Sequence, residues 1–400
     1  MACCQAAEPH LPAAQPLELA DIFRPFGDEL PLLSPEQRKA VHDIMRCRTE
    51  VLGGHIYQCD QCGHLQELYN ACRNRNCPKC QNLDQARWLQ ARQQELLPVQ
   101  YFHVVFTIPD EIKAIFLANK TACYNLLFAA VAETLKQVAL NPDLLGARIG
   151  FMAVLHSWTQ TLLFHPHLHC IVPGGGLNST NDQWVSTKPG FLLPVQVLSL
   201  VFRGKLLDKL QQAASQGKIG LAGTDLDTLL QQAARHSWVV YCRPPFAGPQ
   251  QVLRYLSRYT NQIAIGNQRL VALDGRQVTF RYKDRADSGK TKLMSLDAAE
   301  FLCRFLLHVV PNGLVRIRYY GLLANAVKKD NLALCRQLLS VTDESVDPGP
   351  GDDTWQELLL QLTGFDATLC PSCRVGHMKL KHELIASQTP WAWRSRATSP

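Results

Sequence analysis

One short segment of the chain, FHPHLHC, carries three histidines at alternate positions inside the apolar run TLLFHPHLHCIVPGGG. In an extended strand successive side chains point to opposite faces, so His165, His167 and His169 share one face. Leu168 and Cys170 point to the other face, where apolar burial holds the strand. Cα atoms two residues apart along a strand are separated by ~6.6 Å, which lets imidazoles reach one metal ion. A lone histidine would indicate only a wet strand face, but three at this spacing predict a metal site.

Four cysteines nearer the N-terminus form two Cys-x-x-Cys pairs, Cys59 with Cys62 and Cys77 with Cys80. Each pair can form a tight turn that presents two thiolates to one tetrahedral ion. The spacing is typical of a zinc-ribbon or treble-clef module. We therefore predict that these four residues bind one structural zinc ion.

Other cysteines and histidines leave further zinc sites open. Cys47, His55 and Cys72 lie near the two pairs in sequence, and they either form a second site or only pack in the interior. The tail holds a third Cys-x-x-Cys pair followed by two histidines: Cys370, Cys373, His377 and His382. The intervals after this third pair are shorter than those of a zinc finger.

The cysteine content also bears on the compartment. Structural disulfides are rare in a reducing cytosol, so 15 cysteines fit a cytoplasmic protein if the clustered ones bind metal. No apolar run approaches the ~18 residues of a membrane span, and the N-terminus lacks a basic region followed by an apolar core. We therefore expect a cytoplasmic globular protein that has no membrane partner.

A second stretch, QVLRYLSRYTNQIAI, predicts a helix with Tyr255 and Tyr259 one turn apart on one face. The same spacing is typical of a helix that faces a core. However, Arg254 and Arg258 flank the tyrosines, and residues 254–292 hold nine Lys and Arg against three Asp, which favours a nucleic-acid backbone as partner. Other candidate DNA-binding residues lie around the second cysteine pair and in the segment RIRYYG: Arg73, Arg75, Lys79, Arg316 and Arg318.

The order of predicted elements indicates an α+β fold. A strand at 101–108, helix over roughly 111–140, and strands at 149–156 and 161–172 predict an antiparallel or mixed sheet with helices on one face. The segment DESVDPGPGDD reads as a flexible linker. The expected domains are an N-terminal helix and zinc-binding module at 1–98, a catalytic domain at 99–295, an extension of helices and strands at 296–342, an acidic Pro/Gly linker at 343–354 and a tail with Cys-x-x-Cys at 355–400. The C-terminal region as a whole is expected to be mostly helical.

Metal-bound histidines and paired tyrosines together suggest one chemistry. A divalent ion polarises a phosphodiester while a tyrosine hydroxyl attacks phosphorus and becomes linked to DNA. The tyrosyl ester keeps the energy of the phosphodiester, so a free 3′-hydroxyl can reverse the step and transfer a strand. With two tyrosines, one can hold the first DNA end while the other cleaves a second.

At these residues the chain resembles the HUH single-strand endonucleases, in which two histidines flank one hydrophobic residue. More closely it resembles the rolling-circle transposases of the insertion sequence ninety-one type. The resemblance covers most of residues 20–330 and is carried by LGGH, YNACRNRNCPKCQ, HPHLHCIVPGGGL, YLSRYTNQIAI and RIRYYGLLAN. One departure is Asn76, where such proteins often have a histidine before the second cysteine pair.

The resemblance implies a role for each matched residue. His167 and His169 would hold catalytic Mg²⁺ or Mn²⁺, and Tyr255 and Tyr259 would be the nucleophiles. The zinc ligands would be Cys59, Cys62, Cys77 and Cys80. The third ligand of the catalytic ion stays open among His165, Gln262 and Asn261.

The fold implied is a small antiparallel sheet with the histidines on a central strand and the tyrosine helix beside them. The activity implied is cleavage and joining of single-stranded DNA at element ends and target through a 5′-phosphotyrosine intermediate. Two alternatives keep the same motifs. One is a zinc-dependent DNA-binding protein without catalysis, and the other is a rolling-circle replication initiator or conjugative relaxase.

Overall fold

The computed structural model of the chain describes residues 16–220, 223, 225–243, 263–340 and 354–387. Several predicted site residues lie outside this part of the chain: Arg254, Tyr255, Arg258, Tyr259, Asn261 and Gln262. The predicted linker at 343–354 lies outside it as well, except for Thr354. Among the described helices, none is both long and apolar enough to cross a bilayer.

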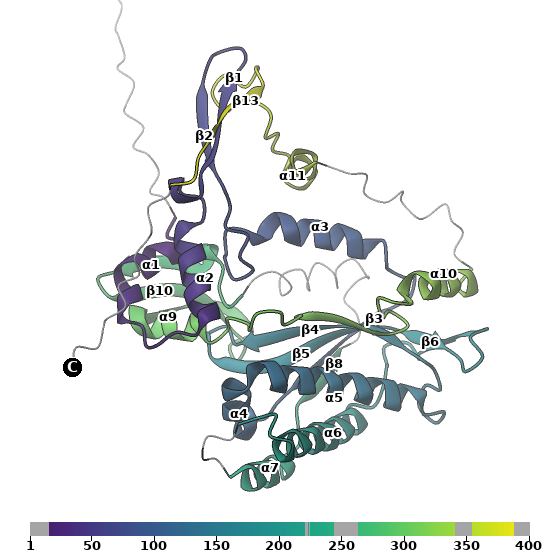
Figure 1. The fold of residues 1–400 in the computed structure, drawn as a ribbon. Coiled ribbons are helices and arrows are strands. Elements are labelled where there is room, and N and C mark those ends of the chain that lie inside the picture. Colours follow the sequence, from purple (N-terminus) through teal and green to yellow (C-terminus); the bar gives the residue numbers. More distant parts are fainter. Residues whose placement is uncertain (1–15, 221–222, 224, 244–262, 341–353, 388–400) are drawn as a thin grey trace, which may run out of the picture.

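A five-stranded antiparallel sheet forms the centre of the molecule (Figure 1). In spatial order its strands are β12 (Ile317–Gly321), β4 (Gly150–Trp158), β5 (Phe164–Pro173), β3 (Tyr101–Thr107) and β8 (Val240–Arg243). The predicted α+β fold with an antiparallel sheet is confirmed. The histidine strand is β5, in the middle of the sheet, where neighbours on both sides satisfy its backbone groups.

Helices α4 (Lys113–Ala118), α5 (Lys120–Leu140) and α6 (Val195–Ser215) cover one face of this sheet, and α7 (Leu226–Ala234) packs against α6. The main core lies between them and the sheet, and it includes Leu168 and Cys170 of β5, both fully buried. This confirms the predicted alternation of faces along β5. The helical stretch predicted over 111–140 is a short 3₁₀ turn and two helices, because the chain leaves helical geometry at Asn119.

The opposite face is also covered, so the prediction of helices on one face only was wrong. Helix α3 (Gln81–Gln93) lies across this face in Figure 1, and Trp88 packs against a small cluster that includes Tyr101, Met152 and Val154. Those strand positions are apolar although they point away from the main core. A sheet that is apolar on both faces needs cover on both.

The two N-terminal helices pack against elements that are far away in the sequence. The sequence Ser34-Pro35 predicts the start of a helix. Helix α2 (Pro35–Arg46) does begin there, and the side chains of Ser34 and Gln37 form a capping box. Together with α1 (Leu19–Phe26) it lies beside α9 (Ala298–Leu306), where the rings of Phe23 and Phe305 meet edge to face at 6.0 Å. Helix α9 rests on a second antiparallel sheet, β9 (Leu270–Asp274), β10 (Gln277–Asp284) and β11 (Lys290–Asp297).

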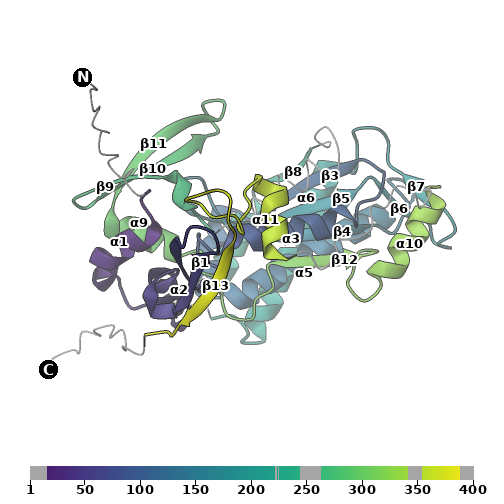
Figure 2. The ribbon, with the colours of Figure 1, turned by 90° about the horizontal axis from the view of Figure 1, so that it is seen from above.

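The C-terminal region, predicted to be mostly helical, contributes strands to two sheets, one from the extension and one from the tail. Strand β12 forms an edge of the central sheet before α10 (Lys328–Leu338). Strand β13 (Met378–Leu384) pairs along β1 (Gly54–Cys59), which also pairs with β2 (Leu65–Tyr69). These three strands form an arm that projects from the body (Figure 1). Helix α11 (Trp355–Thr363) packs against α3, over which it lies in the view of Figure 2.

A glycine run after β5 has a structural explanation. Its last two members lie in β6 (Gly175–Leu177), which pairs with β7 (Trp184–Ser186). A Cβ at Gly176 would collide with the carbonyl oxygen of Arg148. The run therefore allows close backbone approach, and it provides no support for a phosphate-binding loop.

Candidate functional site

Three buried histidines converge on the face of the sheet opposite the main core. His156 lies near the end of β4, and His167 and His169 lie on β5; their ligand nitrogens are all within 4.8 Å of one another. The antiparallel register places His156 directly across from His167. The three residues are only 6%, 7% and 3% exposed. Rigid central strands therefore hold three imidazoles in a cluster small enough for one metal ion.

Hydrogen bonds orient two of these rings. The Nδ1–H of His167 donates to the carbonyl of His165 over 2.6 Å, which leaves Nε2 as the nitrogen with a lone pair. Nδ1 of His169 lies 2.7 Å from Nε2 of His103 on β3, and these two rings stack. Such partners fix the orientation and tautomer of an imidazole that binds metal. His103 is thus a positioning residue for His169.

Burial keeps the cluster neutral. Loss of solvent lowers the pKa of His167 to about 3 and that of His103 to about 4, and it holds the pKa of His156 and His169 well below the ordinary value. Neutral imidazole is the form that coordinates metal. The donor set, its convergence and its charge state all fit a divalent ion.

The structure assigns the third position of the cluster to His156, which the sequence reasoning missed. Of the candidates named for that position, His165 contributes its carbonyl to His167 and is not part of the cluster, while Gln262 and Asn261 lie outside the described residues. A signal was present in the sequence. The strand predicted at 149–156 ends in a histidine, and antiparallel pairing with the next strand brings that end opposite the start of the histidine run.

Two exposed arginines, in addition to the buried Arg316, add positive charge near the histidines. The charge of Arg285, in the turn between β10 and β11, contributes to the lowered pKa of His167 and His169, after burial, the main cause. Arg243 at the end of β8 acts in the same way on His103. Both arginine side chains are exposed. They offer cationic groups to a phosphate backbone at the rim of the cluster.

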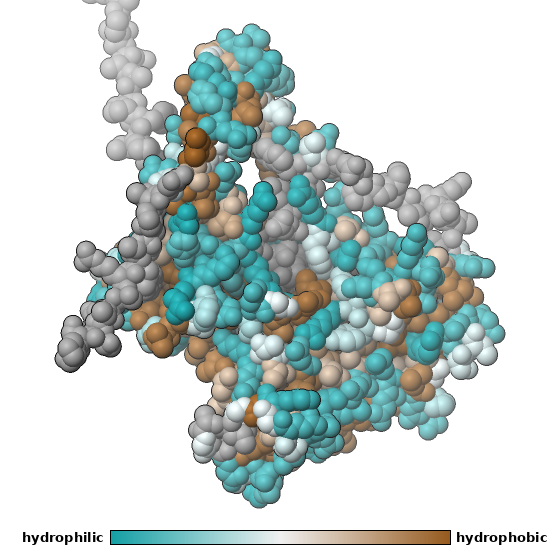
Figure 3. All heavy atoms as spheres, in the orientation of Figure 1, coloured by the Kyte–Doolittle hydropathy of each residue, from teal (hydrophilic) through white to brown (hydrophobic). Residues whose placement is uncertain are grey.

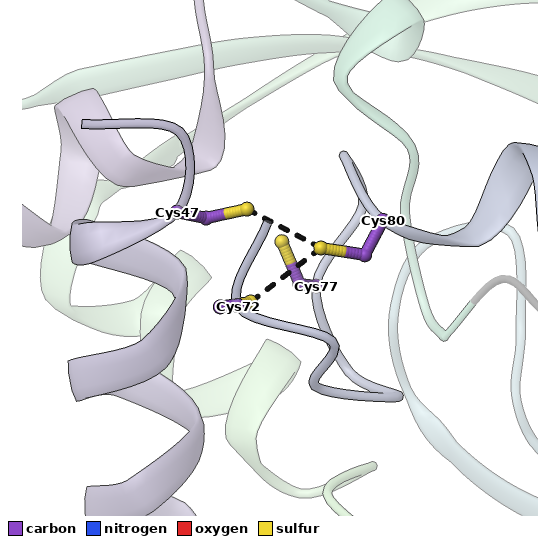
Figure 4. Close-up of side chains that lie close together, drawn as sticks. All are labelled: Cys47, Cys72, Cys77 and Cys80. Atoms are coloured by element: carbon purple, nitrogen blue, oxygen red, sulfur yellow. Dashed lines mark hydrogen bonds between the residues drawn. The ribbon is translucent and has the colours of Figure 1, made fainter. Parts of the chain in front are cut away.

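The cysteines form two groups of four, and the predicted set of zinc ligands was wrong. Cys77 and Cys80 lie with Cys47 and Cys72 (Figure 4), whereas Cys59 and Cys62 lie with the third Cys-x-x-Cys pair, that of the tail. The reason is the arm. Strand β1 carries Cys59 roughly 17 Å from its first residue, at ~3.3 Å per residue, while the chain after β2 returns to the end of α2.

The group of Cys47, Cys72, Cys77 and Cys80, here called the body cluster, is compact and tied to its surroundings. Sγ of Cys80 lies 3.3 Å from that of Cys47 and 3.5 Å from that of Cys72. Lys79 donates to the carbonyl of Cys47 over 3.3 Å and pairs with Glu18. The body cluster is complete without Asn76 and without His55, so the departure at Asn76 removes no ligand from it.

The structure separates the predicted DNA-binding residues. Arg75 donates to the carbonyls of Pro311 at 2.6 Å and Leu314 at 2.8 Å, so its guanidinium holds a loop. Arg316 is 9% exposed, and burial lowers its pKa to about 10. Lys79 is engaged at the body cluster. These three side chains serve structural contacts, which argues against phosphate binding by them.

Two other predicted DNA contacts differ in exposure. Arg73 is exposed in the loop that leads to the body cluster. Arg318 is half-buried: it donates to the carbonyl of Val315 and to Oδ1 of Asn125, and it lies over the ring of Phe128 at 4.1 Å. It lines a groove of about 630 Å³ along the outer edge of β12, away from the histidines. Arg254 and Arg258 lie outside the described residues.

Comparison with known proteins gives two family matches along the chain. Residues 150–331 match the family described as "Putative transposase", and this region contains all three clustered histidines. Residues 21–108 match the family described as "Transposase zinc-binding domain", and this region contains the whole body cluster.

Similar proteins carry the same name. "Putative transposase y4qJ" of Sinorhizobium fredii (strain NBRC 101917 / NGR234) is 47% identical over 90% of this chain and 94% of its own length. "Transposase for insertion sequence element IS801" of Pseudomonas savastanoi pv. phaseolicola is 27% identical over 83% of this chain and 81% of its own. A solved structure of the conjugative relaxase TrwC in complex with oriT DNA matches 40% of this chain and 71% of its own at 15% identity; its TM-score of 0.23 is too low to support an argument.

Proposed function

This chain belongs to the transposases of the insertion sequence ninety-one type, and from that premise we propose that it cleaves and joins single-stranded DNA through a covalent 5′-phosphotyrosine intermediate. The observation that carries the proposal is the buried cluster of His156, His167 and His169 on the central strands. A DNA-binding protein without catalysis would not need three converging imidazoles in a buried site. A metal-dependent cleavage reaction would use them to hold its ion.

The histidine cluster would hold the catalytic divalent ion. Such an ion, when bound, polarises a scissile phosphodiester and stabilises the charge that develops on its oxygens. Imidazole ligands favour Mn²⁺ over Mg²⁺, so Mn²⁺ is expected to support the higher activity. The protein supplies the rigid strands, and the rings are aimed by the hydrogen bond that His167 donates to the carbonyl of His165 and by the one between His169 and His103.

Tyr255 and Tyr259 are the proposed nucleophiles, on the basis of the sequence. The phenolic oxygen forms a bond to phosphorus, the phenolic proton passes to solvent or a nearby base, and the bond from phosphorus to the 3′-oxygen breaks. The DNA then carries a free 3′-hydroxyl on one side and a 5′-phosphotyrosine on the other. Attack by a 3′-hydroxyl on that ester reverses the step and joins strands, and a second tyrosine lets two ends be held in one cycle.

Two further features would serve this function: arginines that contact DNA and a zinc site that stabilises the N-terminal module. Arg243 and Arg285, at the rim of the histidine cluster, would bind the phosphates on either side of the scissile bond, and Arg73 would bind DNA near the N-terminal module. The body cluster would hold a structural zinc ion, since four thiolates in a closed set are typical of such sites.

A covalent adduct tests the proposed nucleophiles. With labelled single-stranded DNA from an element end and Mn²⁺, we expect a protein–DNA adduct on a denaturing gel. Tyr255→Phe and Tyr259→Phe should each lower the yield, and the double variant should give none. Tyr69→Phe, on the arm, is the matched control and should behave like the parent chain. An undiminished adduct in a folded double variant would contradict the mechanism.

A second measurement tests the rim arginines. Arg285→Gln should weaken binding of single-stranded DNA and lower the slope of log affinity against log salt by about 1, as expected for loss of one phosphate contact. Arg281→Gln, an exposed residue of the same hairpin, is the control and should leave the slope unchanged. Equal slopes for the two variants would show that Arg285 makes no special contact.

A further inference from the structure

We propose that Cys59, Cys62, Cys370 and Cys373 bind a second zinc ion, which fastens the C-terminal tail to the arm of the N-terminal module. We call these four residues the arm cluster. The matched zinc-binding region, residues 21–108, contains only half of it. The inference does not depend on the proposed cleavage chemistry, because the arm cluster is separate from the histidine cluster.

The sulfur positions suit tetrahedral zinc. Sγ of Cys59 lies 3.7 Å from that of Cys373, and Sγ of Cys62 lies 3.7 Å from that of Cys370. Zinc–sulfur bonds of ~2.3 Å in a tetrahedron place neighbouring sulfurs about 3.8 Å apart. A disulfide would need ~2.05 Å instead. The two pairs therefore face each other at the separation that a shared ion sets.

The two pairs also adopt similar turns. After each second cysteine comes a residue with positive φ, Gly63 at 73° and Arg374 at 55°. Its N–H donates to the carbonyl of the first cysteine, over 3.1 Å to Cys59 and 2.9 Å to Cys370. Each chain segment thus closes the tight turn expected of a zinc-binding Cys-x-x-Cys pair.

Backbone N–H groups point at the sulfurs. The N–H of Gln61 donates to Sγ of Cys59, and that of Gly376 to Sγ of Cys373, each over 3.4 Å. Donors of this kind stabilise a thiolate over a thiol. A Cβ at position 376 would approach Sγ of Cys59 to 2.5 Å, so this position requires glycine. The backbone of one segment is shaped around the sulfur of the other.

Besides the arm cluster, β13 is held by its backbone ladder with β1 and by exposed polar contacts of Asp60 with His377 and Lys379, and the arm has little apolar core. In β1, β2 and β13 only Gly54 and Cys59 are buried, and apolar side chains such as Leu65 and Leu380 are 51% and 54% exposed. The arm tip is mostly hydrophilic in Figure 3. A small sheet without a core is marginally stable by itself. Metal binding supplies folding free energy where burial does not.

An ion in the arm cluster would also affect the face of the central sheet that carries the histidines. The ligands lie 308 residues apart in sequence, yet they join β13 to β1. The same tail carries α11, which packs against α3, the helix that lies across the histidine side of the sheet. An ion in the arm cluster would therefore anchor the segment that braces α3.

Zinc content measured by mass spectrometry on the purified full chain tests the assignment. We expect two zinc ions per chain, and one after Cys370→Ser, Cys373→Ser or both together. Adding Cys77→Ser to the Cys370→Ser/Cys373→Ser variant should also remove the remaining ion, that of the body cluster. Cys303→Ser, outside both clusters, should keep two. Two ions retained in the Cys370→Ser/Cys373→Ser variant, or one in the parent chain, would overturn the proposal.

Two further measurements separate loss of the ion from loss of folding. Cys373→His should restore the second ion, because imidazole also binds zinc. A protease site placed within residues 341–353 of the full chain should leave the cut tail bound to the parent protein and release it from Cys59→Ser. Failure of the adduct assay would leave these outcomes unchanged, whereas a tail that stays bound in Cys59→Ser would overturn the fastening role.

Discussion

Replacing His156 with alanine is expected to reduce metal-dependent cleavage on the order of a thousandfold, as much as replacing His167 or His169. Bound metal contributes several kcal/mol of charge stabilisation in the transition state, and each 1.36 kcal/mol corresponds to a factor of ten in rate. No motif marks His156. Its expected importance rests on the register that brings it across from His167.

The matched control is His165→Ala. This histidine belongs to the same run, but only its backbone carbonyl orients His167, and alanine keeps that carbonyl. The measurement is single-turnover cleavage of labelled single-stranded DNA, paired with Mn²⁺ affinity from calorimetry. If His165→Ala lost the metal and His156→Ala kept it, the assignment of the third ligand would be wrong.

The second large effect is expected from Cys77→Ser, which should remove one zinc ion and unfold the N-terminal module. Structural zinc contributes about 10–16 kcal/mol to the folding of small zinc-binding modules, comparable to or larger than the 5–15 kcal/mol total stability of a typical domain. The body cluster ties the end of α2 to the loop before α3, and so joins the helices beside α9 to the helix over the histidines. Its loss should also lower cleavage.

Thermal unfolding and limited proteolysis, with zinc content measured on the same samples, check this expectation. Cys62→Ser provides a useful contrast, since it removes the arm ion while the helices around the body cluster keep their core. Cys303→Ser controls for loss of a thiol. Unchanged stability of Cys77→Ser at reduced zinc content would contradict a structural role for the body cluster.

Features that depend on neighbouring residues were predictable from sequence. Alternation along β5 placed His167 and His169 opposite Leu168, and the Ser-Pro start predicted the cap of α2. In both cases the geometry is set within a few residues by backbone periodicity and local hydrogen bonds. The order of strands and helices, and the resemblance to transposases, followed from the same local patterns.

Features that depend on residues far apart in sequence were decided by the tertiary structure. The spacing of Cys59, Cys62, Cys77 and Cys80 indicated four ligands for one ion, but it contained nothing about the length of the arm that separates the two pairs or about a tail that pairs with β1.

The positions of His156 and Arg285 were also decided by the tertiary structure and not by local sequence. Each lies near the histidines because strands pair in one register and a distant hairpin turns toward the sheet. The type and spacing of residues along the chain therefore identified the candidates for binding metal or DNA. Only the three-dimensional fold determined which of them meet, because strand register and hydrophobic burial act between segments that the sequence alone does not place side by side.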